Sequence, residues 1–100
     1  MTKRISITAT VTEGVITRSI TVSGRDAWAL QELVAAGGKG CTPIDNPGPR
    51  WSAYVHKLRH RYGLTIETIH ESHGGEFPGN HARYILRTKV TIRDDERRAA

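Results

Sequence analysis

The chain has 100 residues, enough for one domain, and its 37% hydrophobic residues are enough to bury a small core. Fifteen lysines and arginines oppose ten acidic residues, and the resulting net charge of +5 favours binding to phosphate backbones or anionic surfaces. No apolar run approaches the roughly 20 residues that span a bilayer. The N-terminal residues also lack the apolar core of a signal peptide. The single cysteine, Cys41, excludes an intrachain disulfide. These features predict a cytoplasmic protein that does not associate with membranes.

Residues 4–22 alternate between apolar and hydroxyl side chains in two runs. The runs flank Glu13 and Gly14, and a short glycine-containing turn between two β-branched runs is typical of a β-hairpin. An isolated hairpin is marginally stable, so its apolar face must pack either on the same domain or on a second copy of the chain. Its open edge could also pair with a second copy, although Lys3, Arg4 and Arg18 oppose such pairing. A homodimer is therefore one of two open alternatives.

Two helix signals follow the hairpin. The first is a capping-box spacing at Ser23-Gly24-Arg25-Asp26, which predicts a helix over residues 25–36 that Gly37 ends. The second is Thr42 followed by Pro43, which matches an N-cap with proline at the first helical position. It predicts a short helix over residues 43–46.

Residues 50–62 carry the strongest helical pattern. Their apolar side chains recur at helical spacing and form one stripe that should face the core, made of Trp51, Tyr54, Val55, Leu58 and Tyr62. Residues 64–92 predict a second hairpin with a long polar turn over residues 71–81 and a return strand over residues 82–92. A charged tail, residues 94–100, follows.

The order of elements is hairpin, helix, short helix, helix, hairpin. It predicts an α+β fold, a winged helix-turn-helix with an extra N-terminal β-hairpin, in a single domain. The motifs behind this order run from Gly24-Arg25-Asp26-Ala27-Trp28-Ala29-Leu30 through Gly40-Cys41-Thr42-Pro43-Ile44-Asp45, Arg50-Trp51-Ser52-Ala53-Tyr54-Val55 and His73-Gly74-Gly75 to Ala82-Arg83-Tyr84-Ile85-Leu86.

In these motifs the chain resembles the winged-helix domain proteins, including small stand-alone ones from bacteria and phages. The resemblance implies a recognition helix, which maps onto residues 50–62, and a wing, which maps onto residues 64–92. The chain departs from the family pattern in one respect, because its middle helix is reduced to about one turn.

The distribution of charge agrees with a DNA-binding surface. No acidic residue occurs from Asn46 through Ile66 or from Phe77 through Arg93, so cations there could neutralise phosphates. Arg50 and Lys57 could also reach guanine O6 and N7. The predicted DNA-binding residues are Arg50, Ser52, Ala53, His56, Lys57, His60 and Arg61 on the helix and His73, Asn80, Arg83, Arg87 and Lys89 in the wing.

Two functions remain open at this point. The first is a double-stranded DNA-binding protein that regulates transcription or a mobile element. The alternative is a winged-helix protein-interaction module, an inhibitor or adaptor in a phage or host complex, for which the His- and Gly-rich wing and the short middle helix leave room. His56 and His60 have a spacing that can hold zinc, but no glutamate follows His56 and neighbouring cations oppose a metal ion. No nucleophile, base and orienting group fall together, so no enzyme, metal or cofactor is predicted.

Overall fold

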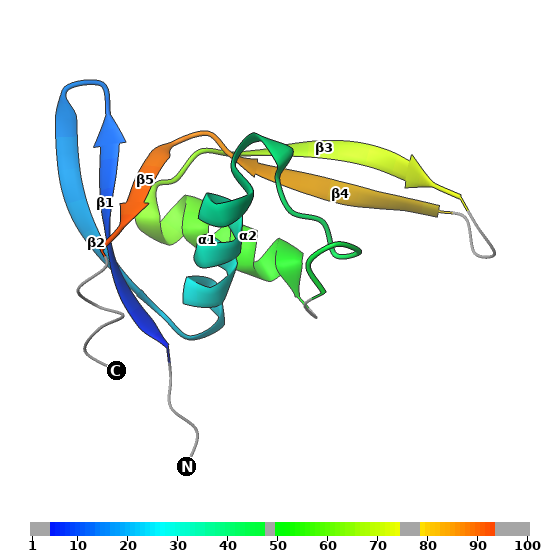
Figure 1. Ribbon diagram of the computed structural model, residues 1–100, viewed down its shortest axis with the longest axis horizontal. Coiled ribbons are helices and arrows are strands. Elements are labelled where there is room, and N and C mark those ends of the chain that lie inside the picture. The colour runs from blue at the N-terminus through cyan, green and yellow to red at the C-terminus, as the bar shows by residue number, and fades with distance from the viewer. Residues whose placement is uncertain (1–4, 48–49, 75–78, 94–100) are drawn as a thin grey trace, which may run out of the picture.

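The computed structural model describes residues 5–47, 50–74 and 79–93 and opens with the predicted hairpin (Figure 1). β1 (Ser6–Glu13) and β2 (Ile16–Ser23) pair in antiparallel register over their full length. Gly14 lies in the turn at φ 63°, a conformation that is costly for residues with a Cβ. The apolar face of this hairpin packs on the domain's own core, as the burial of Ile7, Val11 and Val22 shows.

The return strand predicted over residues 82–92 is in fact two strands in different sheets. β4 (Gly79–Leu86) belongs to the second hairpin, whereas β5 (Lys89–Ile92) pairs with β1 and gives a three-stranded sheet of order β2-β1-β5. The prediction of one strand is wrong because Thr65 binds the residues between β4 and β5. The carbonyl of Thr65 accepts from the N–H of Arg87 at 2.8 Å. Its own N–H donates to the Thr88 hydroxyl at 2.7 Å.

Helix α1 (Gly24–Ala36) begins immediately after β2 and ends at Gly37, which adopts φ 58° as a helix-ending glycine does. The predicted helix is confirmed, but the predicted capping box is wrong. The side chain of Ser23 makes no capping hydrogen bond, and Ser23 lies at the end of β2, opposite Ser6 in the sheet. Instead, the N–H of Gly24 donates to the carbonyl of Ile5 at 2.7 Å.

The short helix predicted over residues 43–46 is a single hydrogen-bonded turn. Between α1 and residue 50, the one helical element among the described residues is a 3₁₀ helix, η1 (Gly37–Lys39). Thr42 does act as a cap, since its hydroxyl accepts from the N–H of Asp45 at 2.9 Å. The turn cannot lengthen into a helix because Asn46 precedes Pro47, and a residue before proline is disfavoured in helical conformation.

Helix α2 (Trp51–Tyr62) follows the prediction most closely. Its apolar stripe is buried at Trp51, Tyr54, Val55 and Leu58. Gly63 ends it in the left-handed conformation at φ 67°.

The wing consists of β3 (Ile66–His73) and β4, which project from the helices as an arm (Figure 1). At its base, Cys41 bridges to β4: its N–H and carbonyl both bond to the backbone of Tyr84 at 2.8 Å. The connection between α1 and α2 is thereby fixed to the wing.

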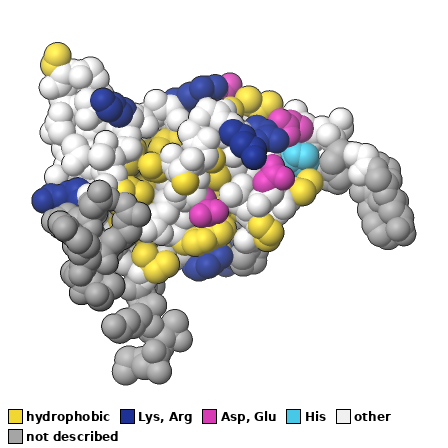
Figure 2. Space-filling model, in the orientation of Figure 1, with side chains coloured by type: hydrophobic (Ala, Val, Ile, Leu, Met, Phe, Trp, Pro, Cys, Tyr) yellow, Lys and Arg dark blue, Asp and Glu magenta, His cyan; other side chains and the backbone are white. Residues whose placement is uncertain are grey.

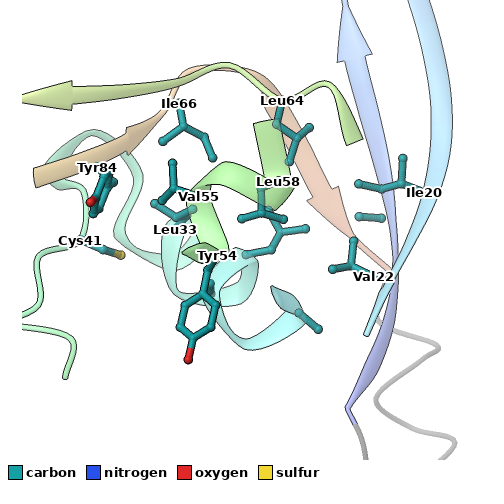
Figure 3. Packing of buried hydrophobic residues seen from close by; sticks show 14 of the residues in the cluster. Ile20, Val22, Leu33, Cys41, Tyr54, Val55, Leu58, Leu64, Ile66 and Tyr84 are labelled. Atoms are coloured by element: carbon teal, nitrogen blue, oxygen red, sulfur yellow. The ribbon is translucent and has the colours of Figure 1, made fainter. Parts of the chain in front are cut away.

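One apolar cluster joins both helices to both sheets. In Figure 3, Leu58 of α2 lies between Leu33 of α1 and the inward side chains of Ile20 and Val22 on the first hairpin, and Val55 lies beside Leu33. This cluster holds α2 with its opposite face outward. No helix among the described residues is long and apolar enough to cross a membrane.

Candidate nucleic-acid interface

The outward face of α2 is basic and polar. Arg50, at the N-cap, and Lys57 are exposed, and Ala53 is half-buried. The other exposed side chains of this face are Ser52, His56, His60 and Arg61. The structure thus brings all seven predicted helix residues to one surface, which we call the α2 face.

Arg50, Lys57 and Arg61 are the cations of the α2 face. Within the described ranges their side chains form no hydrogen bond or ion pair with another residue, and Lys39 and Lys89 are the other cations in this condition. A cation without an internal partner can approach a phosphate or a base without first losing a contact in its own protein.

Arg59 is also on α2 but turns away from this face. Its guanidinium donates to the carbonyl of Ile66 and to the Thr68 hydroxyl at 2.7 Å. Arg59 therefore joins the last turns of α2 to the first residues of β3. The sequence alone does not reveal this contact, because nothing in the spacing of Arg59 shows that β3 passes beside it.

The rings of His56 and His60 lie 4.3 Å apart on the α2 face and are tilted by 40°. A structural zinc site takes four ligands, and a catalytic site takes three with an open position. Among the described residues no group of three or more His, Cys, Asp or Glu side chains is placed to hold a metal ion. We therefore treat the two histidines as polar members of the α2 face.

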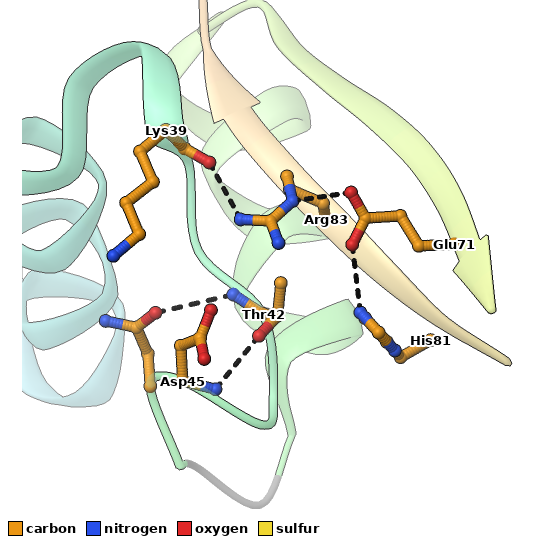
Figure 4. A network of polar contacts seen from close by, with 7 residues as sticks. Lys39, Thr42, Asp45, Glu71, His81 and Arg83 are labelled. Atoms are coloured by element: carbon orange, nitrogen blue, oxygen red, sulfur yellow. Dashed lines mark hydrogen bonds and ion pairs between the residues drawn. The ribbon is translucent and has the colours of Figure 1, made fainter. Parts of the chain in front are cut away.

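Two of the predicted DNA-binding residues in the wing bind carboxylates of the same wing. Arg83 of β4 donates to Glu71 of β3 at 2.7 Å and to the carbonyl of Lys39 at 2.9 Å (Figure 4). Arg87 pairs with Glu67 in the same manner. Figure 2 shows the outcome, with basic and acidic side chains touching where the wing leaves the body. Arg83 is thus a positioning residue that holds the wing against η1.

The remaining predicted wing residues are placed unevenly. Asn80 is exposed at the outer end of β4. Lys89 is exposed too, but it lies on β5 opposite Thr12 and therefore in the other sheet. The side chain of His73 lies outside the part of the structure that is described.

The ion pair between Arg83 and Glu71 should make the stability of the wing depend on pH. The hydrogen bond from Arg83, with a smaller contribution from His81, holds the pKa of Glu71 below its ordinary value. A carboxyl group with a lowered pKa in the folded state stabilises that state above its ordinary pKa, here 4.5, and the effect is lost as pH falls further.

We expect Glu71→Gln to lower the melting temperature relative to the parent at pH 6, because the ionised carboxylate is lost. The difference should shrink as the pH falls below 4.5, and thermal melts of both proteins across this range measure it. Glu13→Gln is the control, because it removes a carboxylate from the first hairpin instead of the wing. A difference that stays constant down to pH 2.5 would mean that the Glu71 carboxylate does not stabilise the wing.

Cys41 is a structural residue. Its side chain is fully buried, and desolvation, followed by the charge of Glu32, raises the pKa of the thiol from 9.0 to about 11. A thiol that remains protonated at neutral pH is a poor nucleophile.

Comparison with known proteins identifies one family. A family model described as a winged helix domain matches residues 19–96, from the middle of β2 to beyond β5. No curated protein and no solved structure matches the chain.

Proposed function

Because the chain belongs to the winged-helix domain family, whose members generally bind DNA, we propose that it binds double-stranded DNA. In this proposal α2 enters the major groove and the wing lies along the backbone or the minor groove. The observation that carries the proposal is the α2 face, where three cations have no partner among the described residues and no acidic side chain interrupts them.

The shape of the α2 face supports insertion into a groove. Ser52 and Ala53, both small, occupy its first turn, where recognition helices approach the base edges most closely. Arg50 precedes them at the N-cap, and Lys57 lies one turn further along. Arg61 stands near the last turn, within reach of a phosphate at the border of the groove.

The wing has a supporting role in this proposal. Arg59 fixes β3 to α2, and Arg83 fixes both wing strands to η1, so the arm keeps a set direction relative to the α2 face. Asn80 at its outer end is then available for the backbone or the minor groove, whereas Arg83 and Arg87 act within the wing.

We further propose that the protein is a regulator of transcription or of a mobile element rather than an enzyme. A small domain that occupies the major groove competes with other proteins for the same site, and this suffices for regulation. The buried Cys41 thiol, whose pKa is raised to about 11, is a poor nucleophile and does not favour a catalytic role.

Fluorescence anisotropy with a labelled mixed-sequence duplex at several salt concentrations tests the proposal. We expect saturable binding whose affinity falls steeply with salt, as for any interaction that neutralises phosphates. If the folded protein binds no duplex even at low salt, the proposal is wrong and a protein-interaction module becomes the better explanation.

We also propose a homodimer formed by antiparallel pairing of two β2 strands. In the described chain β2 has no neighbour on its outer side. It lacks the proline and lysine that commonly protect an edge strand. Its one charge, Arg18, bends inward, where its guanidinium donates to the carbonyl of Tyr62 at 2.6 Å and approaches Glu13 at 3.6 Å.

The apolar residues at the two ends of the first hairpin fit a twofold arrangement. Ile16, beside the turn, is 66% exposed, and Ile5, beside the opposite end of β2, is 44% exposed. Antiparallel pairing of two β2 strands brings the turn of one copy to the opposite end of the other. Each Ile16 would then lie near the Ile5 of the second copy.

We expect light scattering to give the mass of a dimer for the parent at micromolar concentration. Thr21→Lys should give a monomer, because this side chain is exposed on β2 and lysine opposes edge pairing. Thr91→Lys is the matched control, since it adds the same charge on β5. A monomeric parent, or equal masses for both variants, would contradict pairing through β2.

A further inference from the structure

We infer that the base read by the α2 face is guanine. This inference rests on the proposed function, because it specifies what α2 would contact in the major groove. The side chains of the α2 face carry amino, guanidinium, imidazole, hydroxyl and methyl groups. None of the described side chains on this face is a carboxylate or a carboxamide, so hydrogen-bond donors dominate it.

The major groove distinguishes bases by their donors and acceptors. Guanine presents two acceptors, N7 and O6, and accepts from lysine or arginine. Adenine presents an acceptor beside a donor and is matched by asparagine or glutamine, whereas the cytosine amino group requires an acceptor such as a carboxylate. A face dominated by donors is therefore complementary to guanine rather than to adenine or cytosine. Thymine presents one acceptor, O4, and so offers such a face one hydrogen bond where guanine offers two.

Lys57 is the residue best placed for this contact. It is exposed, and the position one turn before it holds Ala53, whose methyl group leaves the space beside the lysine open. Within the described ranges the ammonium group has no polar partner. Arg50, at the N-terminal end of the same face, offers a second and bidentate donor.

The amide group of Asn46, which precedes α2, is already engaged elsewhere. The amide nitrogen of Asn46 donates to Glu32 at 3.0 Å, and its oxygen accepts from the N–H of Thr42 at 3.4 Å. Asp45 belongs to the same turn and is exposed on the connection before α2, outside the α2 face. The Asn46 amide is therefore not free to match adenine, and the α2 face itself has no carboxylate to match cytosine.

The two histidines of the α2 face can donate, but each can also accept a hydrogen bond. Each neutral imidazole has one N–H donor and one acceptor nitrogen, and the tautomer depends on its surroundings. His56 and His60 are therefore tested separately from Lys57.

The test begins with a duplex library whose randomised core is one DNA turn long, from which the parent protein selects its tightest binders. In the best duplex, every guanine is replaced by 7-deazaguanine, which keeps Watson–Crick pairing and the O6 acceptor but lacks N7. We expect affinity to fall at least about fivefold, the lower end of the discrimination that a specific base contact provides. Replacing every adenine by 7-deazaadenine is the matched control and should change affinity less than twofold.

Lys57→Ala assigns the contact to its residue. This variant should bind the original duplex about as weakly as the parent binds the 7-deazaguanine duplex, and it should lose most of its sensitivity to the replacement. His56→Ala and His60→Ala should retain that sensitivity.

The outcomes separate this inference from the proposed function. If no duplex is enriched and none binds, DNA binding itself is wrong. If a duplex is enriched but tolerates 7-deazaguanine, or is sensitive only to 7-deazaadenine, the protein binds DNA and the assignment of guanine is wrong. Equal sensitivity in the parent and Lys57→Ala would move the guanine contact to another residue and contradict the role of Lys57.

Discussion

Replacement of Leu58 by alanine is expected to lower the free energy of unfolding by about 2–5 kcal/mol, the usual cost of truncating a buried leucine. Leu58 has no exposed surface and lies at the centre of the apolar stripe of α2 (Figure 3). Its loss leaves a cavity between α2, α1 and the first hairpin, whose side chains can close it only partly. For a domain of 100 residues this is a large share of the total stability.

Urea denaturation followed by circular dichroism measures this effect. Trp51→Ala should be comparably severe. The indole stacks on the ring of Tyr84, with 6.0 Å between the ring centroids, and its N–H donates to the carbonyl of Asn46 at 2.7 Å. Lys57→Ala on the opposite face is the control and should unfold like the parent. If Leu58→Ala unfolds like the parent, the orientation of α2 described here is wrong.

Replacement of Lys57 or Arg50 by alanine is expected to weaken DNA binding by about 1–3 kcal/mol if the side chain contacts a base. Neither replacement should change stability, because neither side chain has a polar partner among the described residues. The loss should be greatest on the preferred sequence and smaller on unrelated duplexes.

Lys39→Ala is the matched control for this prediction. It removes the same charge from η1, where the side chain is likewise exposed and without a described polar partner, yet lies outside α2. Anisotropy titrations of the three variants on the same duplex give the comparison. If all three bind like the parent, α2 does not read the DNA.

Local patterns predicted the helices well because their signals depend on neighbours in the sequence. The stripe of α2 follows from helical period alone, and Gly37 and Gly63 end their helices because a glycine tolerates positive φ. The two pairs of strands were also predicted from local alternation and turn residues.

The errors arose where contacts depend on residues distant in the sequence. Val90 and Ile92 alternate as though they continued β4, and only the position of β1 shows that they join the first sheet. Ser23 precedes α1 as its spacing predicts, but its side chain makes no capping hydrogen bond. For residues 89–92, tertiary context overrides the local preference.

The wing shows the same limit for the candidate site. Residues 77–93 contain no acid, which suggested that Arg83 was free for DNA. In the antiparallel register, however, Glu71 lies opposite His81 and diagonally across from Arg83. Absence of carboxylates along one strand therefore says little about the strand beside it, whereas the α2 face could be predicted because a helix surface is set by its own sequence.

The most direct test of whether α2 is the DNA-binding surface is the salt dependence of DNA binding. It is measured for the parent and for a variant in which Arg50, Lys57 and Arg61 are all changed to alanine. We expect the variant to remain folded, to bind more weakly, and to show a shallower slope of log affinity against log salt, by about 1 for each cation that contacts a phosphate. An unchanged affinity and slope in the folded variant would show that the protein binds DNA through another surface or not at all.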